Sequence, residues 1–226
     1  DLGNGFAAAS SIWAAVDAWQ KCSNIQVLEE SEDVVCIRYT YTAPAMPGLK
    51  TEVTYTVDST CRMKMDIHYF GMEGRPELPL LGLRFATPVP AEQVVWVGLS
   101  GETYPDRKKG GIFGTYSEAP HISDYLVPQE CSCHMDTHQM TLRLSNHALT
   151  IQKDEKPFAF SAIPYTPQQL SEAFHGDELP VPCRTVVTLC GAMRGVGGID
   201  SWGANVEEAY RVSAEKDIGF SIRFWL

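Results

Sequence analysis

The feature that most constrains this fold is a clean alternation of apolar and polar residues in the first third of the chain. In the segment 62–69 (RMKMDIHY), one side is apolar and consists of Met63, Met65, Ile67 and Tyr69. The other side is polar and consists of Arg62, Lys64, Asp66 and His68. Segments 51–57 and 38–42 alternate in the same way. A period of two with one polar face is typical of antiparallel strands with one face in water.

Further strand candidates follow at regular intervals, separated by glycine and proline. We expect strands at 81–85, 94–98, 140–145, 158–162, 185–189, 209–213 and 219–225. Many short strands with such punctuation predict a large sandwich or barrel. We find no internal repeat and no long linker, so we expect one all-β domain over residues 1–226.

Two segments are predicted to be helical. Residues 6–20 place apolar side chains at helical spacing and predict an amphipathic helix. Residues 166–176 predict a surface helix of two to three turns, with Thr166 as N-cap, Pro167 in the first position, Gln169 completing a capping box and Gly176 as the stop.

The bulk composition excludes some classes of partner. The net charge of −10 argues against nucleic acid and anionic membranes as partners. No apolar run approaches the roughly 18 residues that a membrane-spanning helix needs. The chain begins with Asp1 rather than Met, so we expect a fragment of a longer protein, and a cytoplasmic and a periplasmic location both remain open.

The cysteines favour buried thiols over a disulfide framework. Seven is an odd number and too few for a disulfide scaffold. Five lie scattered among apolar residues and are interpreted as small buried thiols: Cys22, Cys36, Cys61, Cys183 and Cys190. Cys190 is also a weak candidate for a nucleophile, but a buried thiol at a strand end is the better interpretation.

The segment 131–138 (CSCHMDTH) is dense in residue types that bind metals. On a strand, Cys131 and Cys133 would face one way, and His134, Asp136 and His138 the other. The spacing does not match the usual zinc loops. A metal site on His134, Asp136 and His138 therefore stays a weaker alternative to a polar sheet rim.

Motifs for a catalytic centre are missing from the sequence. There is no G-x-S-x-G elbow, and no sequence feature pairs two carboxylates as glycosidase chemistry requires. We therefore predict no catalytic residue in this chain. For the loop at Tyr104 to Arg107 we expect a structural role, with a bond from the Tyr hydroxyl and an Asp–Arg pair.

The loop 194–205 (RGVGGIDSWGAN) carries the strongest candidate for a binding residue. It holds four glycines and, near its tip, Trp202 next to Asp200 and Ser201. An indole can stack on the C–H face of a sugar, and a carboxylate can bind its hydroxyls. Trp202, with Asp200 and Ser201, is thus a candidate sugar platform, while an ordinary core tryptophan under a glycine loop is the alternative.

An ordered set of short motifs resembles a known family. The segments GLRF, VVWVGL, YPDR, DYLVPQE, FSAIPYTPQQLSEAFHGDEL and GVGGIDSWG occur in the order and spacing of the C-terminal small-chain domain of the β-galactosidases of glycoside hydrolase family 2. The likeness is strong over 82–226 and looser over 24–80. The sequence departs from the family pattern with Thr103 for Asn, with His134 and His138 for two arginines, and with Cys190 for Asp.

The resemblance implies a fold, an activity and a role for Trp202. It implies an antiparallel supersandwich like galactose mutarotase with one or two short helices, within an enzyme that hydrolyses terminal β-galactosides. The catalytic carboxylates and metal ions would lie in another domain, so no cofactor is expected here. Trp202 would contribute to the sugar site of that domain. The implied partners are the β-galactoside and the remaining domains of a homo-oligomeric enzyme.

Two other functions remain as alternatives. A free-standing carbohydrate-binding module would bind sugar by itself. A mutarotase-like epimerase would need a histidine and a carboxylate facing a sugar ring, for which His175 and Glu178 are the only pair we can suggest, and these are expected to have a structural role at a helix end.

Overall fold

The computed structural model describes residues 3–123 and 130–226 and is mostly antiparallel β-structure, as the alternation predicted. The loop motif DYLVPQE falls largely outside the described residues. By contacts, the chain forms two compact units. Unit 1 consists of residues 1–81, 154–156 and 192–225, and unit 2 consists of residues 82–153, 157–191 and 226. Whether both belong to one domain stays a prediction.

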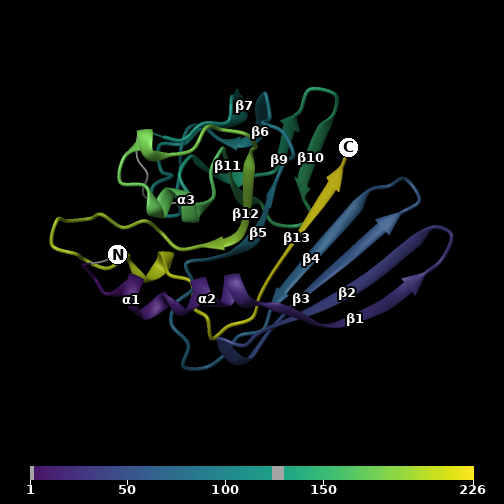
Figure 1. The fold of residues 1–226 in the computed structure, drawn as a ribbon, viewed down its shortest axis with the longest axis horizontal. Coiled ribbons are helices and arrows are strands. Elements are labelled where there is room, and N and C mark those ends of the chain that lie inside the picture. Colours follow the sequence, from purple (N-terminus) through teal and green to yellow (C-terminus); the bar gives the residue numbers. More distant parts are fainter. Residues whose placement is uncertain (1–2, 124–129) are drawn as a thin grey trace. The chain divides into compact units, whose positions relative to one another are not determined.

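Unit 1 contains a run of neighbouring antiparallel strands in the order β1-β2-β3-β4-β13 (Figure 1). These are β1 (Lys21–Glu30), β2 (Val34–Ala43), β3 (Met46–Asp58), β4 (Met63–Tyr69) and β13 (Ile218–Trp225). On β4 the predicted alternation is confirmed, because Met65, Ile67 and Tyr69 are buried and the residues between them are not. The face that bears Lys64, Asp66 and His68 is therefore the polar face.

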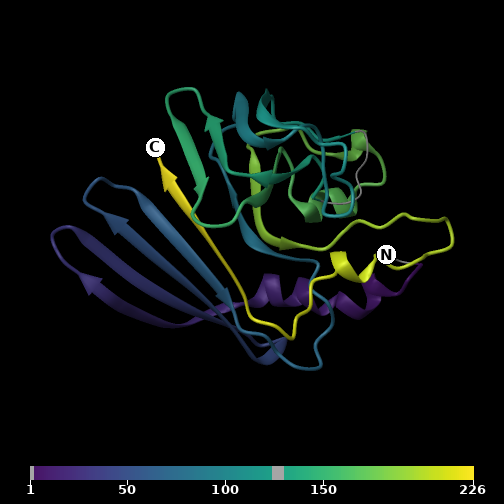
Figure 2. The ribbon, with the colours of Figure 1, turned by 180° about the vertical axis from the view of Figure 1, so that it is seen from behind.

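The N-terminal helix of unit 1 is interrupted once. Helix α1 (Phe6–Ser10) is followed after Ser11 by α2 (Ile12–Trp19), so the expected helix is present in two parts (Figure 2). Trp13 packs into the core of this unit, where its ring lies 6.2 Å from that of Tyr69. Its indole N–H donates a hydrogen bond to the Pro76 carbonyl. These contacts fix the helices to the connection that follows β4.

Unit 2 is a sandwich. One layer contains neighbouring strands in the order β10-β9-β6-β7, and the other has the order β5-β12-β11-β8. Their bounds are β5 (Leu80–Ala86), β6 (Gln93–Leu99), β7 (Phe113–Glu118), β8 (Cys133–Thr137), β9 (Gln139–Arg143), β10 (Ala148–Lys153), β11 (Phe158–Ile163) and β12 (Val186–Met193). Trp96 on β6 and Phe160 on β11 meet edge-on with ring centroids 6.0 Å apart, so the two layers share one core.

The predicted short helix is present as α3 (Pro167–Glu172), with both bonds of the capping box formed. It ends before the expected stop at Gly176. Ala173 is already extended, and the Glu178 carboxylate accepts a hydrogen bond from the Phe174 N–H. A 3-10 turn, Gly176–Glu178, follows.

Two other expectations are wrong. Residues 209–213 do not form a strand; they contain a 3-10 turn, Glu208–Tyr210, and a single bridge between Leu78 and Val212. Among the five scattered cysteines only Cys190 is buried, whereas Cys22, Cys61 and Cys183 are exposed and Cys36 is intermediate. Cys22 lies on β1, which is exposed along its whole length, and Cys61 lies in a turn with φ of 60°.

Candidate functional site

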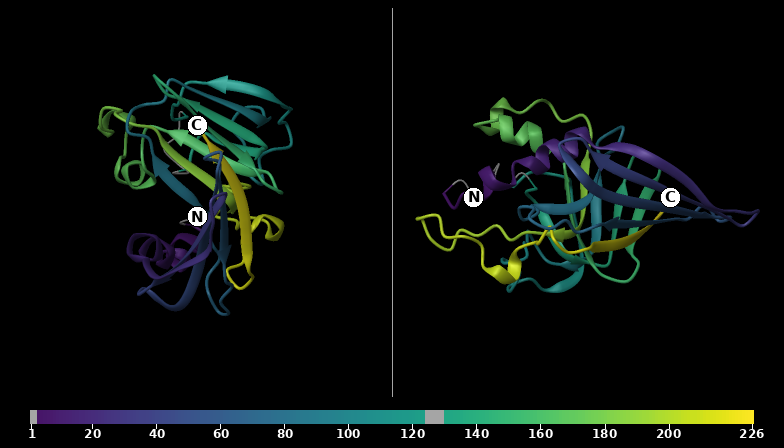
Figure 3. Two further views of the ribbon diagram at one scale, coloured as in Figure 1. Left: turned by 90° about the vertical axis from the view of Figure 1, so that its right-hand side faces the viewer. Right: turned by 90° about the horizontal axis from the view of Figure 1, so that it is seen from below.

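The loop 194–205, which we call the Trp202 loop, leaves β12 and displays its indole to solvent. Trp202 is 92% exposed, so it is not the core tryptophan of the alternative interpretation. Burial of a large apolar side chain contributes roughly 1.5–3 kcal/mol to stability, and Trp202 forgoes nearly all of that gain. Figure 3 shows this loop, in yellow-green, as a long excursion of the chain.

Arg194 fixes both ends of the Trp202 loop. Its side chain is almost fully buried, and Nη2 donates a hydrogen bond of 2.6 Å to the amide oxygen of Asn205, at the other end of the loop. Nε lies 3.3 Å from a carboxylate oxygen of Glu77, and the guanidinium lies over the Phe6 ring at 3.8 Å. The loop therefore has a rigid base although it is rich in glycine.

The tip of the loop is organised by Asp200 and by glycines. The Asp200 carboxylate accepts hydrogen bonds from the Ala204 and Trp202 N–H groups, and these bonds lower the pKa of Asp200. Gly203 has φ of 84°, and a Cβ on it would lie 2.9 Å from the carbonyl carbon of Gly3. Ser201 is exposed. A sugar-binding role for Asp200 and Ser201 stays a prediction, since the Asp200 carboxylate already serves the turn.

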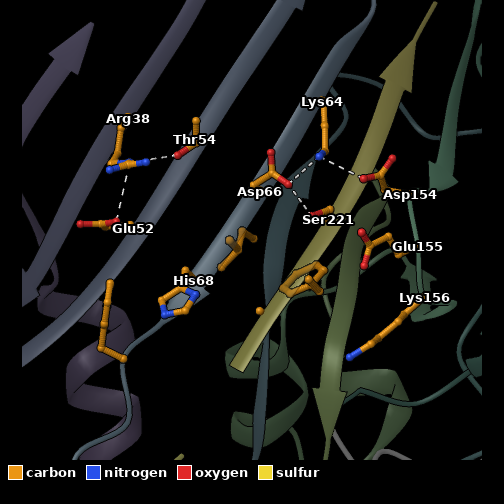
Figure 4. A pocket seen from close by; sticks show the side chains of 14 residues that line it. Arg38, Glu52, Thr54, Lys64, Asp66, His68, Asp154, Glu155, Lys156 and Ser221 are labelled. Atoms are coloured by element: carbon orange, nitrogen blue, oxygen red, sulfur yellow. Dashed lines mark hydrogen bonds and ion pairs between the residues drawn. The ribbon is translucent and has the colours of Figure 1, made fainter. Parts of the chain in front are cut away.

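A second feature, which the sequence did not predict as a site, is a polar cavity on the face of the unit 1 sheet (Figure 4). We call it the sheet pocket, and its volume is about 550 Å³. It is lined by Arg38, Glu52, Thr54, Lys64, Asp66, Ile67, His68, Phe70, Asp154, Glu155, Lys156, Gly219, Phe220 and Ser221.

The strand register explains how the floor of the sheet pocket forms. One cross-strand row contains Arg38, Thr54, Asp66 and Ser221, which pair in this order from β2 to β13. The neighbouring row on the same face pairs Glu52 with His68 and His68 with Gly219. Side chains that lie opposite one another on adjacent strands are neighbours, so residues far apart in sequence form one polar surface.

Ion pairs connect this floor to the segment 154–156. Lys64 lies 3.0 Å from carboxylate oxygens of both Asp66 and Asp154, and Arg223 lies 2.6 Å from Asp154. Burial by itself would raise the pKa of Asp154, but the pairs with Lys64 and Arg223 outweigh it and hold the pKa below its usual value. Asp66 also accepts a hydrogen bond from the Ser221 hydroxyl.

The candidate metal residues on 131–138 point to different environments. His134 is buried between the rings of Trp96 and Phe160, with Nδ1 2.9 Å from the Gly101 carbonyl and Nε2 3.1 Å from the Glu118 carboxylate. Asp136 pairs with Lys108, and His138 meets the Phe113 ring.

The structure therefore does not bring these three side chains together. Positive φ angles at Ser132 and Asp136 interrupt the simple alternation on which the expectation of a shared face rested. Within residues 3–123 and 130–226, no group of three or more His, Cys, Asp or Glu side chains is placed to hold a metal ion.

Other residues singled out in the sequence have structural partners. The Tyr104 hydroxyl donates to Glu102, and Arg107 lies 3.6 Å from a carboxylate oxygen of Asp106, as expected for that loop. Burial raises the pKa of Cys190 to about 12, so this thiol is protonated at neutral pH. Glu178 bonds the Phe174 N–H and its own N–H donates to the His175 carbonyl, which is a helix-end arrangement.

One property of the described helices also bears on partners. In the part of the chain that the structure describes, no helix combines the length and the apolar character needed to span a bilayer.

Comparison with known proteins gives the family. The family model for the β-galactosidase small chain matches residues 3–224. The β-galactosidase small subunit of Latilactobacillus sakei is 39% identical, over 97% of this chain and 79% of that protein. The β-galactosidase BgaC of Bifidobacterium adolescentis is 31% identical over the whole of this chain, which spans 22% of BgaC.

Among solved structures, a putative aldose 1-epimerase from Escherichia coli K12 is similar with a TM-score of 0.42 and 9% identity, over 90% of this chain and 69% of that chain. The family assignment rests on the sequence matches, which cover nearly the entire chain. This chain belongs to the β-galactosidase small-chain family.

Proposed function

We propose that this chain is the non-catalytic small chain of a β-galactosidase and that its Trp202 loop completes the sugar site of the catalytic part. The enzyme would hydrolyse terminal β-galactosides by the two-carboxylate route of retaining glycosidases. Both carboxylates and any metal ions would belong to the remaining part of the enzyme. The small subunit and the longer β-galactosidases among its relatives support a role as one component of a larger enzyme.

The observation that carries this proposal is the exposure of Trp202 on a loop with a rigid base. A flexible loop would lose conformational entropy when a ligand binds. In this loop the contacts of Arg194 with Asn205 and Glu77 fix the two ends before any ligand binds. The indole offers a large apolar surface at little entropic cost, since it has only two side-chain torsions. Stacking on the C–H face of a pyranose would use that surface.

The test is Trp202→Ala in the full β-galactosidase that contains this chain. We expect KM for lactose to rise about tenfold, which corresponds to roughly 1.4 kcal/mol of binding free energy. Because Trp202 is almost fully exposed, the free energy of unfolding should change by less than about 0.5 kcal/mol.

The matched control is Phe174→Ala, which removes another exposed aromatic side chain, 88% exposed, from a different loop. This variant should leave KM unchanged. If Trp202→Ala also leaves KM unchanged for several β-galactosides, the Trp202 loop has no part in the sugar site. A conservative Trp202→Phe variant should recover part of the affinity because it restores an aromatic face.

A further inference from the structure

The sheet pocket has features that an ordinary solvated sheet face does not need. It is concave, and its volume of about 550 Å³ lies within the range of roughly 300–1,000 Å³ that is typical of small-molecule sites. Two of its carboxylates are largely withdrawn from solvent: the side chain of Glu52 is 18% exposed and that of Asp154 is 15% exposed. Both carboxylates are paired with cations, Glu52 with Lys50 and Asp154 with Lys64.

The charges of the sheet pocket are nearly balanced, and this limits the class of ligand. Its lining contains three cations, Arg38, Lys64 and Lys156, and four carboxylates, Glu52, Asp66, Asp154 and Glu155. Two further cations pair with carboxylates of the lining, Lys50 with Glu52 and Arg223 with Asp154. A phosphate or carboxylate ligand would meet the four carboxylates, and a polycation would meet the three cations. The lining therefore favours a neutral ligand that can both donate and accept hydrogen bonds.

The lining groups have hydrogen-bonding capacity beyond their mutual ion pairs. A carboxylate offers about four acceptor positions, and Glu52 is paired with Lys50 at 2.8 Å and with Arg38 at 3.7 Å. Hydroxyl groups of a ligand can use the positions that these two cations leave. The neighbouring Thr54 hydroxyl accepts from Arg38 and keeps its own proton available for donation.

Gly219 leaves a hollow in the floor of the sheet pocket. Gly219 on β13 pairs with His68 on β4. His68 carries a side chain at this position, whereas Gly219 is exposed and carries none. A Cβ at this position would meet only ordinary contacts, 3.5 Å to the Ile67 carbonyl oxygen and 3.7 Å to His68 Nδ1. The sheet itself does not require glycine there, and a glycine inside a strand often marks close approach of a ligand to the backbone.

One end of the sheet pocket is aromatic. The Phe70 ring lies 4.3 Å from the His68 ring at an interplanar angle of 62°. The pocket thus combines an apolar element with many polar groups, which is the composition of sites for small polar ligands. Figure 4 shows the polar side chains distributed around the hollow, with Arg38 and Glu52 on one side and Asp154, Glu155 and Lys156 on the other.

From this geometry we propose that the sheet pocket binds a neutral sugar, with Glu52, Asp66 and Asp154 accepting bonds from its hydroxyls, Arg38 and Lys64 donating to its oxygens, and the ring lying over Gly219. This binding site belongs to unit 1 by itself and does not depend on the role of Trp202. It is assigned binding only, with no bond made or broken.

The experiment is an NMR titration of the 226-residue chain, in which the backbone amide shifts of Asp66, Lys156 and Gly219 are followed. The probes are D-galactose, D-glucose and inorganic phosphate. We expect saturable shifts at these amides with at least one of the two sugars and none with phosphate. Shifts that do not saturate with either sugar, or that saturate with phosphate, overturn the proposal.

Gly219→Val is the decisive variant, because it fills the hollow with a residue that favours strands. We expect sugar binding to weaken by at least about tenfold. The control Gln152→Val places the same side chain at an exposed position of β10, outside the sheet pocket, and should bind as the parent chain does. If Gly219→Val binds sugar as tightly as the control, the proposal is wrong.

Two further variants keep the result interpretable. Glu52→Gln serves as the test if Gly219→Val does not fold. It preserves the size of the side chain, removes its charge and should weaken sugar binding. Unchanged affinity in this variant overturns the proposal. Trp202→Ala should leave binding by the isolated chain intact. Loss of sugar binding in Trp202→Ala would instead assign the titrated site to the Trp202 loop and overturn the sheet pocket.

Discussion

The Trp202 loop and the sheet pocket offer polar and aromatic groups to solvent in different ways. The loop is one contiguous stretch whose ends are joined by Arg194 and whose tip is held by Asp200. The pocket takes its side chains from β2, β3, β4 and β13, from Phe70 directly after β4, and from the segment 154–156. The loop is therefore visible as a sequence motif, while the pocket exists only once the strand register is set.

The two regions also use glycine differently. Gly203 is required by the backbone, because φ is 84° and a Cβ would meet Gly3. Gly219 has no such requirement and supplies open space. Gly203 is thus needed for the backbone conformation of the loop, whereas Gly219 leaves space in the sheet pocket. Three predictions test this contrast, starting from the largest expected effect.

The first prediction concerns the clamp of the Trp202 loop. Arg194→Met keeps most of the volume of the side chain, but removes the donors to Glu77 and Asn205 and the guanidinium that lies over the Phe6 ring. We expect a loss of about 2–3 kcal/mol in the free energy of unfolding, since buried hydrogen bonds to charged groups are lost. Urea unfolding measures this loss. Arg107→Met removes a longer ion pair, 3.6 Å, between a half-exposed guanidinium and the buried carboxylate of Asp106, and should lose less, about 1 kcal/mol.

An equal loss in both arginine variants would show that Arg194 holds the base of the loop no more strongly than the half-exposed Arg107 holds its own loop. The rigid base on which the proposed role of Trp202 depends would then be absent.

The second prediction compares the two glycines directly. Gly203→Ala should destabilise the chain by about 1–3 kcal/mol, because alanine disfavours positive φ and its Cβ would press on the Gly3 backbone. Gly219→Ala should be neutral or stabilise by up to about 1 kcal/mol, because it reduces the entropy of the unfolded chain without a clash. Thermal unfolding of both variants gives the signs, and the same sign in both would contradict the contrast.

The third and smallest effect concerns the pH dependence of the sheet pocket. The pKa of Asp154 lies below its ordinary value of 3.8 in the folded chain, so its ion pairs add stability above that pH and lose it as the pH falls through the lower, folded-state value. Asp154→Asn should reduce stability by about 1 kcal/mol near neutral pH, as is typical of partly exposed pairs.

Urea unfolding at about pH 7 and about pH 3 measures this effect, and the difference in stability between the parent chain and Asp154→Asn should be smaller at the lower pH. A difference that stays constant over this range would mean that Asp154 acts through packing and not through its charge.

The sequence was sufficient for those parts of the fold that depend on local pattern. Alternation gave β4, and a capping box gave the start of α3. It was insufficient for β1, whose exposed residues show no burial pattern. It was also insufficient for the end of α3, where a local bond from the Phe174 N–H to the Glu178 side chain accompanies an earlier end than the glycine stop predicted. Burial of individual cysteines was also unpredictable, because it depends on which strands cover them.

The candidate sites show the same limit. Trp202 could be singled out because its glycines and polar neighbours are adjacent in sequence. Lys64, Asp66 and His68 were recognised only as the polar face of a strand, since Ser221 and Asp154, which complete the pocket, are far away in sequence. The metal alternative at 131–138 depended on strict alternation, and two positive φ angles removed that basis.

The close approach of Gly203 to Gly3 has a practical consequence for making this protein. When residues 1–226 are prepared by themselves, a purification tag joined directly ahead of Gly3 would place added residues beside the segment that supports the indole. Comparisons of binding or stability between preparations with different tags would then mix the effect of a mutation with that of the added residues. A tag joined through a long flexible spacer, or removed by cleavage before assay, avoids this confusion.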